Sequence, residues 1–346
     1  MSDINFIEEL KKQKEPVWKV VQKYLPRKNP TKHYDIVRDY PERQGKYLRP
    51  SLLLWAAEMY GQKKSNALLT AAAMQISEDW LLIHDDFMDH SLERRSTEKE
   101  LKPTLNILYG DEIAVNAGDS LHIIMWKILG DAVKSLKSEI GWKIFNKMND
   151  VLLTTTEGQF MELDWIQTKN LKPTEEEYYK MISIKAGYYT ITGPLQLGVI
   201  IAGQNEAELK KIAQWGLPFG CAFQIWDDVM NLITDTKVQG KERGGDILEG
   251  KRTLILIDLL KKCNQKEKKE IEKIYNKSRE EKTEKEKDFI LDLMEKYGCI
   301  EYAKKTAIDF SEQALKIFKT NTSHLPETKA KKIIKQAISF VVNRER

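Results

Sequence analysis

Two long segments of this chain are apolar on too many sides for helices that lie on a protein surface. They read AAAMQISEDWLLIHDDFMD (71–89) and KIAQWGLPFGCAFQIWDDVMNLI (211–233). Helices of this kind are buried inside a bundle. Elsewhere apolar residues recur at spacings of three and four, and alternating runs are rare, which is typical of amphipathic helices. The sequence therefore predicts an all-α helical bundle.

The expected breaks between helices are short, so the chain offers no clear linker between domains. Its 346 residues include 18 glycines and 10 prolines, a smaller share than average, which favours long helices. We therefore expect a single domain over residues 1–346. The most charged stretch, 261–288, is predicted to be an exposed helical hairpin.

Charge and cysteine content exclude several classes of protein. A net charge of +4 in a chain with 31% charged residues gives no reason to expect a nucleic-acid partner. Three widely spaced cysteines without a CxxC pair indicate neither a disulfide framework nor a zinc site. The chain begins without the apolar core of a signal peptide, and no stretch reaches the roughly 18 apolar residues of a membrane span. We expect a cytoplasmic protein without an integral membrane segment.

Both apolar segments end in carboxylates. The first carries Asp85, Asp86 and Asp89, and the second carries Asp227 and Asp228. On a helix, Asp85 and Asp89 lie one turn apart on the same face. Such neighbours raise one another's pKa and require a cation. Mg²⁺ fits best, because it takes oxygen ligands and completes its shell with substrate phosphates. Carboxylates on two facing helices would then clamp a diphosphate through bridging Mg²⁺ ions.

Three other interpretations of the carboxylates are weaker. A di-iron bundle requires Glu-x-x-His, and none of the five histidines has Glu three residues before it. Glycosidase chemistry uses two separated carboxyl groups and gives no reason for a cluster of three. A solvated acidic face would explain one motif alone, but both motifs lie on helices whose other faces are apolar.

Basic residues complement the acidic motifs. Taken singly, each fits an ordinary surface charge. Together they would surround diphosphate groups, and each arginine would bind two phosphate oxygens in bidentate fashion. They are Lys46 and Arg49 in GKYLRP, Arg94 and Arg95 in ERR, Lys185 in SIKAG, and Lys241 and Lys251 in GKERGGDILEGKRT.

The motif DDFMDHSLERR, followed later by DDVMN, resembles the two aspartate-rich motifs of the trans-isoprenyl diphosphate synthases, the polyprenyl synthetase family. Five stretches also occur in the order of that family and roughly at its spacings: GKYLRP, KPTLNILYGDEIAVNAGD, GQFMEL, FQIWDDVMN and GGDILEGKRT. The resemblance is to its short-chain geranylgeranyl and farnesyl diphosphate synthases. It implies an isoprenoid synthase-like bundle around a central apolar cavity, usually a homodimer.

The resemblance also implies roles for individual residues. Asp85, Asp89 and Asp227 would be ligands of Mg²⁺, three ions with the bound diphosphate, supported by Asp86 and Asp228. The allylic diphosphate would be held by Arg94, Lys185 and Lys241, with Lys251 as a further substrate-binding residue. The diphosphate of isopentenyl diphosphate would be held by Lys46, Arg49 and Arg95. Gln159 and Gln224 match positions near the reacting centre.

The implied reaction condenses isopentenyl diphosphate with dimethylallyl, geranyl or farnesyl diphosphate. Two alternatives stay open: a terpene synthase on the same fold, and a non-catalytic regulatory subunit of a prenyl synthase. Retention of Lys46, Arg49 and Arg95 speaks against the first, because they would bind a second substrate. The complete first motif speaks against the second.

Product length is expected to depend on residues just before Asp85, because the growing chain would run beside this helix. Trp80 lies five positions before Asp85, about 7.5 Å along a helix, with Leu81 at four and the small Ser77 at eight. An aromatic residue at the fifth position resembles the arrangement in archaeal-type geranylgeranyl and farnesyl diphosphate synthases. We therefore expect C15 to C20 products.

Four positions depart from the pattern of the family. Glu78 stands where His or Gln is common, and an acid there would repel a diphosphate unless it pairs with Lys46 or Arg49. Ala186 follows Lys185 in place of threonine, Ser96 replaces the glycine after the paired arginines, and Asn231 ends the second motif in place of Asp. We interpret these as variation within an active enzyme.

Overall fold

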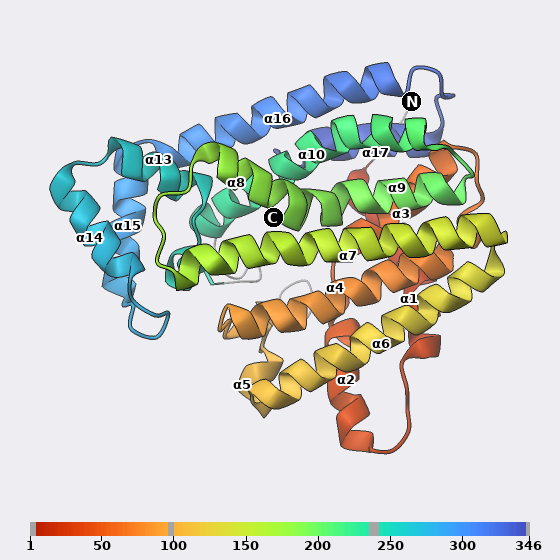
Figure 1. Cartoon of the computed structure of the whole chain (residues 1–346), viewed down its shortest axis with the longest axis horizontal. Helices are drawn as coiled ribbons and strands as arrows, with labels where there is room; N and C mark the ends of the chain where they lie inside the picture. The colour runs from red at the N-terminus through yellow and green to blue at the C-terminus, as the bar shows by residue number, and fades with distance from the viewer. Residues whose placement is uncertain (1–4, 96–99, 235–241, 344–346) are drawn as a thin grey trace.

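The computed structural model describes residues 5–95, 100–234 and 242–343, and it confirms an all-α protein. The helices pack around one continuous hydrophobic core (Figure 1). The α-helices are α1 (Phe6–Tyr24), α2 (Thr31–Arg43), α3 (Leu48–Met59), α4 (Leu68–Met88), α5 (Leu105–Tyr109), α6 (Asp111–Ser135), α7 (Ser138–Gln167), α8 (Glu175–Ile182), α9 (Gly193–Ile201), α10 (Glu206–Ile233), α12 (Gly245–Glu249), α13 (Leu254–Lys262), α14 (Gln265–Tyr275), α15 (Glu284–Lys296), α16 (Cys299–Asn321) and α17 (Lys329–Phe340), with a 3₁₀ turn, η1 (Lys64–Asn66).

Five elements form a ring around the interior in which the sequence predicts an apolar cavity. Helix α4 packs against α3 and α6, α6 packs against α7, and α7 packs against α9, which contacts α3 and closes the ring. Both predicted inner helices are deeply buried: residues 70–77 of α4 are all inaccessible, and α10 is covered by α16. The two acidic motifs therefore lie at the ends of helices fixed by the core.

Between α8 and α9 the chain forms a π-helical segment, η2 (Ser183–Thr192), which carries Lys185. Single π-helical turns are frequent at functional sites. Glycine on both neighbouring helices lets η2 approach closely: a Cβ added at Gly158 would lie 2.5 Å from the backbone nitrogen of Lys185, and one at Gly220 would lie 2.2 Å from the Cα of Gly187. Lys185 is thus held against α7 by backbone packing.

Periodicity did not predict a short antiparallel hairpin, formed by β1 (Glu93–Arg95) and β2 (Leu101–Pro103). Strands of three residues are too short for a recognisable alternation. The hairpin positions the backbone of Arg94 and Arg95 beside the end of α4.

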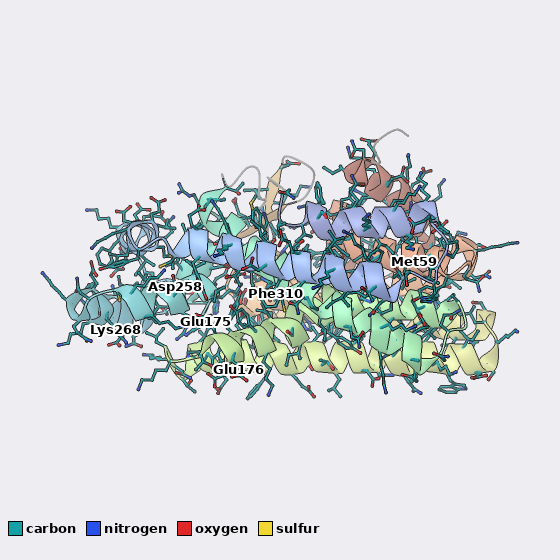
Figure 2. The ribbon with its side chains drawn as sticks, turned by 90° about the horizontal axis from the view of Figure 1, so that it is seen from above. Met59, Glu175, Glu176, Asp258, Lys268 and Phe310 are labelled. Atoms are coloured by element: carbon teal, nitrogen blue, oxygen red, sulfur yellow. The ribbon has the colours of Figure 1, made fainter. Side chains whose placement is uncertain are left out.

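The charged stretch forms the predicted helical hairpin, α14 and α15, at one end of the molecule. Figure 2 shows Lys268 of α14 at this end, far from Met59 of α3. In the described part of the chain, no helix combines the length and apolarity that a membrane span requires.

Candidate active site

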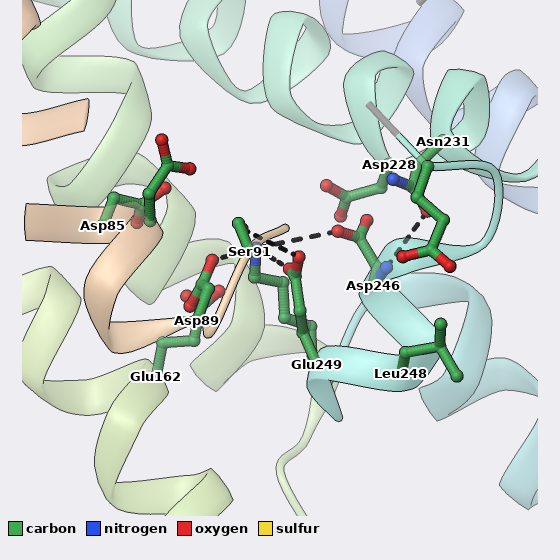
Figure 3. Close-up of polar contacts among 12 residues, drawn as sticks. Asp85, Asp89, Ser91, Glu162, Asp228, Asn231, Asp246, Leu248 and Glu249 are labelled. Atoms are coloured by element: carbon green, nitrogen blue, oxygen red, sulfur yellow. Dashed lines mark hydrogen bonds and ion pairs between the residues drawn. The ribbon is translucent and has the colours of Figure 1, made fainter. Parts of the chain in front are cut away.

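The carboxylates of the two acidic motifs lie at the C-terminal ends of α4 and α10. Figure 3 shows Asp85 and Asp89 on one side of the site and Asp228, Asn231 and Asp246 on the other, with Glu249 of α12 between them. The folded chain thus brings the two motifs to one site, as the sequence predicts.

Asp86 is a buried anchor, with 1% of its surface exposed. Arg94 donates to both of its oxygens, from Nε at 2.7 Å and from Nη2 at 2.5 Å, and the hydroxyl of Tyr40 donates at 2.5 Å. Arg94 also lies 3.7 Å from Asp85 Oδ2. Asp86 therefore holds the β-hairpin and α2 against the end of α4, and it orients Arg94 beside the first motif.

Asp89 is buried and forms an ion pair with Lys251, whose Nζ lies 2.8 Å from its Oδ2. Burial raises the pKa of Asp89 to about 7, and the charges of Asp85 and Glu249 act in the same direction, whereas Lys251 opposes the shift. Lys251 also lies 2.6 Å from Glu249 and 3.6 Å from Asp246. One ammonium group thus connects carboxylates from α4 and α12.

On the second helix, Asp228 is buried while Asp227 is exposed. Tyr178 donates to Asp228 at 2.7 Å, and Gln224 donates at 2.8 Å. Burial, together with the charge of Asp246, raises the pKa of Asp228. Asn231 Oδ1 accepts a hydrogen bond from the backbone nitrogen of Asp246 at 3.2 Å. The asparagine that ends this motif therefore fixes the first turn of α12.

One basic residue from each predicted diphosphate pocket is already paired with an acid. Lys185 forms an ion pair with Glu162 of α7. Arg49 Nη1 lies 2.7 Å from Glu78, Nη2 donates to Thr190 at 3.0 Å, and the guanidinium stacks over the ring of Tyr189. The acid at position 78 thus pairs with Arg49, as its place near a diphosphate pocket requires.

The structure also describes Lys46, Gln159 and Ala186 of the predicted substrate pockets. The side chain of Lys46 is exposed, and Gln159 has a buried amide Nε2 without a hydrogen-bond partner. Ala186 follows Lys185 within η2. Lys241 and Ser96 lie outside the described residues, and for Arg95 only the backbone is described.

Trp80 faces α6. Its ring stacks on His122, with centroids 4.1 Å apart, and its Nε1 donates to His84 Nδ1 at 3.2 Å. Trp126 donates to His122 Nε2 at 2.8 Å, so the aromatic contact continues along α6. Leu81 is half-buried, whereas Ser77 is fully buried and lies 3.0 Å from the hydroxyl of Tyr189. Trp80 is therefore the large side chain of this trio and is held in one orientation.

The donor set at the site fits Mg²⁺. Asp85, Asp89 and Asp227 offer carboxylate oxygens, the ligands that Mg²⁺ prefers. Asp89 is crowded by Asp85 and Glu249, so a divalent cation would relieve their repulsion. Among the described residues, no three acidic, histidine or cysteine side chains converge into a ready-made metal site. A cation here would complete its shell with water and phosphate oxygens, as Mg²⁺ usually does.

Comparison with known proteins identifies the family. The model of the family described as polyprenyl synthetase matches residues 30–294. The chain belongs to the polyprenyl synthetase family. It is therefore a prenyltransferase, as the motifs predict.

Individual relatives agree with this assignment. The chain is 32% identical to a geranylgeranyl diphosphate synthase of Sulfolobus acidocaldarius, over 78% of this chain and 79% of that protein. It is 29% identical to a geranylfarnesyl diphosphate synthase of Aeropyrum pernix, over 87% of this chain and 90% of the relative. The crystal structure of a geranylgeranyl pyrophosphate synthetase from Pyrococcus horikoshii superposes with a TM-score of 0.84 at 32% identity, covering 98% of this chain and 99% of that one.

Sequence reasoning missed several residues of this polyprenyl synthetase site. Glu162, Asp246 and Glu249 lie within motifs that the family resemblance includes, and their partners, Lys185 and Lys251, were predicted. Tyr40, Tyr178 and Arg279 carry no local signal, because their roles depend on contacts with distant segments.

Proposed function

We propose that this polyprenyl synthetase condenses isopentenyl diphosphate with dimethylallyl, geranyl or farnesyl diphosphate and releases diphosphate. The observation that carries the proposal is the ion pair between Lys251 and Asp89, two residues separated by 162 positions. It joins the first acidic motif to the segment that follows the second. Carboxylates and an ammonium group are thus gathered where a metal-bound diphosphate would need both.

The protein's contribution to such a reaction is electrostatic and positional. When bound by Asp85, Asp89 and Asp227, Mg²⁺ ions, three by resemblance to the family, would neutralise the allylic diphosphate and make it a good leaving group. Arg94, Lys185, Lys241 and Lys251 would hold that diphosphate as it departs. Gln224 would be held near the reacting centre by Asp228, to which it donates.

The second substrate would be held by Lys46, Arg49 and Arg95, with its double bond directed at the allylic carbon. Departure of the diphosphate leaves an allylic cation, which the double bond attacks, forming the new carbon–carbon bond. The released diphosphate then accepts the proton that the product loses. No side-chain nucleophile is needed.

We further propose C15 to C20 products, with Trp80 as the block. Its fixed position between α4 and α6 supports this. Relatives of this chain include geranylgeranyl and geranylfarnesyl diphosphate synthases, which are named for products of different length. We therefore expect the product length of this enzyme to depend on its own side chains.

We also propose a homodimer formed through α6 and α7, working in the cytoplasm. Large apolar side chains are exposed on both helices: Ile123 at 69%, Trp142 at 58%, Leu153 at 63% and Phe160 at 68%. These two helices pack against each other, and a homodimer would cover the apolar side chains that both expose. The free thiols Cys221, Cys263 and Cys299 are compatible with a reducing compartment. Light scattering of the purified protein measures the oligomeric state, and a monomer would contradict the dimer.

The function is tested by incubating the purified protein with Mg²⁺, isopentenyl diphosphate and each allylic diphosphate, and then measuring product length. Elongated prenyl diphosphates are expected. Cyclised or hydrolysed products formed without isopentenyl diphosphate would indicate a terpene synthase instead. Absence of turnover with every primer would favour a regulatory subunit.

A further inference from the structure

The charged hairpin is more than a solvated surface. Its loop, residues 276–283 between α14 and α15, contacts α12 at the active site. The side chain of Arg279 is only 10% exposed, and Lys282 donates to the backbone oxygen of Leu248, in α12, at 2.7 Å. Two cations of a stretch expected to be solvated are therefore packed against the segment that presents Lys251.

Arg279 reaches Glu249. Its Nη1 lies 3.5 Å from Glu249 Oε1, and its Nη2 lies 2.6 Å from Glu242, an acid whose side chain is 38% exposed. Glu249 itself is 6% exposed and forms the 2.6 Å ion pair with Lys251. The hydroxyl of Ser91 also donates to Glu249 Oε1, at 3.5 Å. Glu249 is thus a buried carboxylate shared by two cations.

This sharing matters when substrate arrives. Lys251 is held by Asp89 and Glu249, and it must release them to bind a diphosphate. A buried carboxylate that loses its counter-ion is strongly unfavourable. Arg279 lies beside Glu249 and keeps a positive charge there once Lys251 has left, whereas Ser91 is neutral. Lys282 donates to the carbonyl oxygen of Leu248 at the same end of the site.

We propose that Arg279 is a positioning residue that neutralises Glu249 when Lys251 turns to the substrate, and that it thereby sets the affinity for the allylic diphosphate. The inference rests on the proposed function for the role of Lys251. It predicts that Arg279 favours diphosphate binding without touching the diphosphate. Without Arg279, Glu249 would retain Lys251.

The test is a double-mutant cycle with Arg279→Ala, Glu249→Gln and the combined variant. Calorimetry measures binding of inorganic diphosphate in the presence of Mg²⁺, and kinetics measure KM for each substrate. Arg279→Ala is expected to weaken diphosphate binding and raise the allylic KM by about 30-fold, the lower end of the cost of truncating one partner of a buried charge pair. The KM for isopentenyl diphosphate should change little. Glu249→Gln in the Arg279→Ala background should restore most of the loss, because no charge is left unpaired.

Arg279→Lys, which keeps the charge, should retain most of the affinity and guards against a folding defect in the alanine variant. Lys273→Ala is the matched control, since Lys273 lies on the same hairpin, is 68% exposed and pairs with its neighbour Glu270 on α14. Unchanged diphosphate binding in Arg279→Ala would overturn the inference. So would a combined variant that binds diphosphate as weakly as Arg279→Ala does. The proposed function fails separately, if the wild-type protein binds diphosphate but elongates no primer.

Discussion

The indole of Trp80 lies flat against the imidazole of His122, with ring centroids 4.1 Å apart and planes 12° from parallel. The pair joins α4 to α6 at a point just below the first acidic motif. His122 is itself held by Trp126, which donates to its Nε2 at 2.8 Å. Burial lowers the pKa of His122, which favours the neutral ring that accepts this hydrogen bond. The bulk of Trp80 is therefore fixed in place.

Replacing Trp80 by alanine is expected to shift the product from C15–C20 to C25 or longer. Removal of the indole opens apolar volume where the end of the growing chain would otherwise stop. Chromatography of the dephosphorylated products measures the shift, and Trp80→Phe, which keeps an aromatic ring, serves as the control. If Trp80→Ala is folded and active but makes the wild-type product, the block lies elsewhere, with Leu81 and α6 the next candidates.

Asp85→Ala and Asp227→Ala are each expected to lower turnover by several orders of magnitude while helical content stays the same. Each removes a predicted Mg²⁺ ligand from a different helix, and the metal supplies much of the charge stabilisation. Steady-state kinetics and circular dichroism measure both effects, and Asp292→Ala, on the exposed face of α15, is the control. Wild-type turnover in excess EDTA would refute the metal dependence.

The two diphosphate pockets are expected to respond separately to mutation. Lys46→Ala or Arg49→Ala should mainly raise the KM for isopentenyl diphosphate, whereas Lys185→Ala should mainly raise that for the allylic substrate. Because Arg49 pairs with Glu78 at 2.7 Å, the Arg49 variant is also measured in a Glu78→Gln background, where no buried acid is left unpaired. Equal effects of every variant on both substrates would show that the division into two pockets is wrong.

Asp79→Asn is expected to raise the melting temperature, and more so at pH 8 than at pH 5. Asp79 is buried on α4, and burial, with the charge of Glu78, raises its pKa well above the ordinary value. The native state therefore holds a proton that the unfolded chain releases above pH of about 4, so wild-type stability falls as the pH rises. Asparagine does not titrate, so the variant does not lose this stability as the pH rises. We expect a difference of roughly 1–2 °C for each kcal/mol recovered, because the shift per kcal/mol shrinks as the chain lengthens.

Calorimetric melting at the two pH values measures this difference. Asp309→Asn, on the exposed side of α16, should show no such dependence. A stabilisation by Asp79→Asn that is the same at both pH values would mean that the carboxyl group of Asp79 is not responsible.

Much of the fold was predictable because its signals are local. The apolar segments 71–89 and 211–233 specify buried helices by their own composition, and they form α4 and α10. The acidic motifs at the ends of these helices are likewise visible in a few adjacent residues. Periodicity and motif spacing are properties of short segments, so they can be detected without knowing how the rest of the chain folds.

Tertiary structure alone decided the partners of these groups. The sequence predicted both Lys251 and Asp89, but only folding shows that they form an ion pair. The pairing of Trp80 with His122 and the approach of Arg279 to Glu249 also join distant segments. Such contacts arise from the packing of whole helices, and no spacing within a helix or loop encodes them. The sequence by itself therefore determined the helices and their acidic ends, while the packed bundle determined which charges neutralise one another.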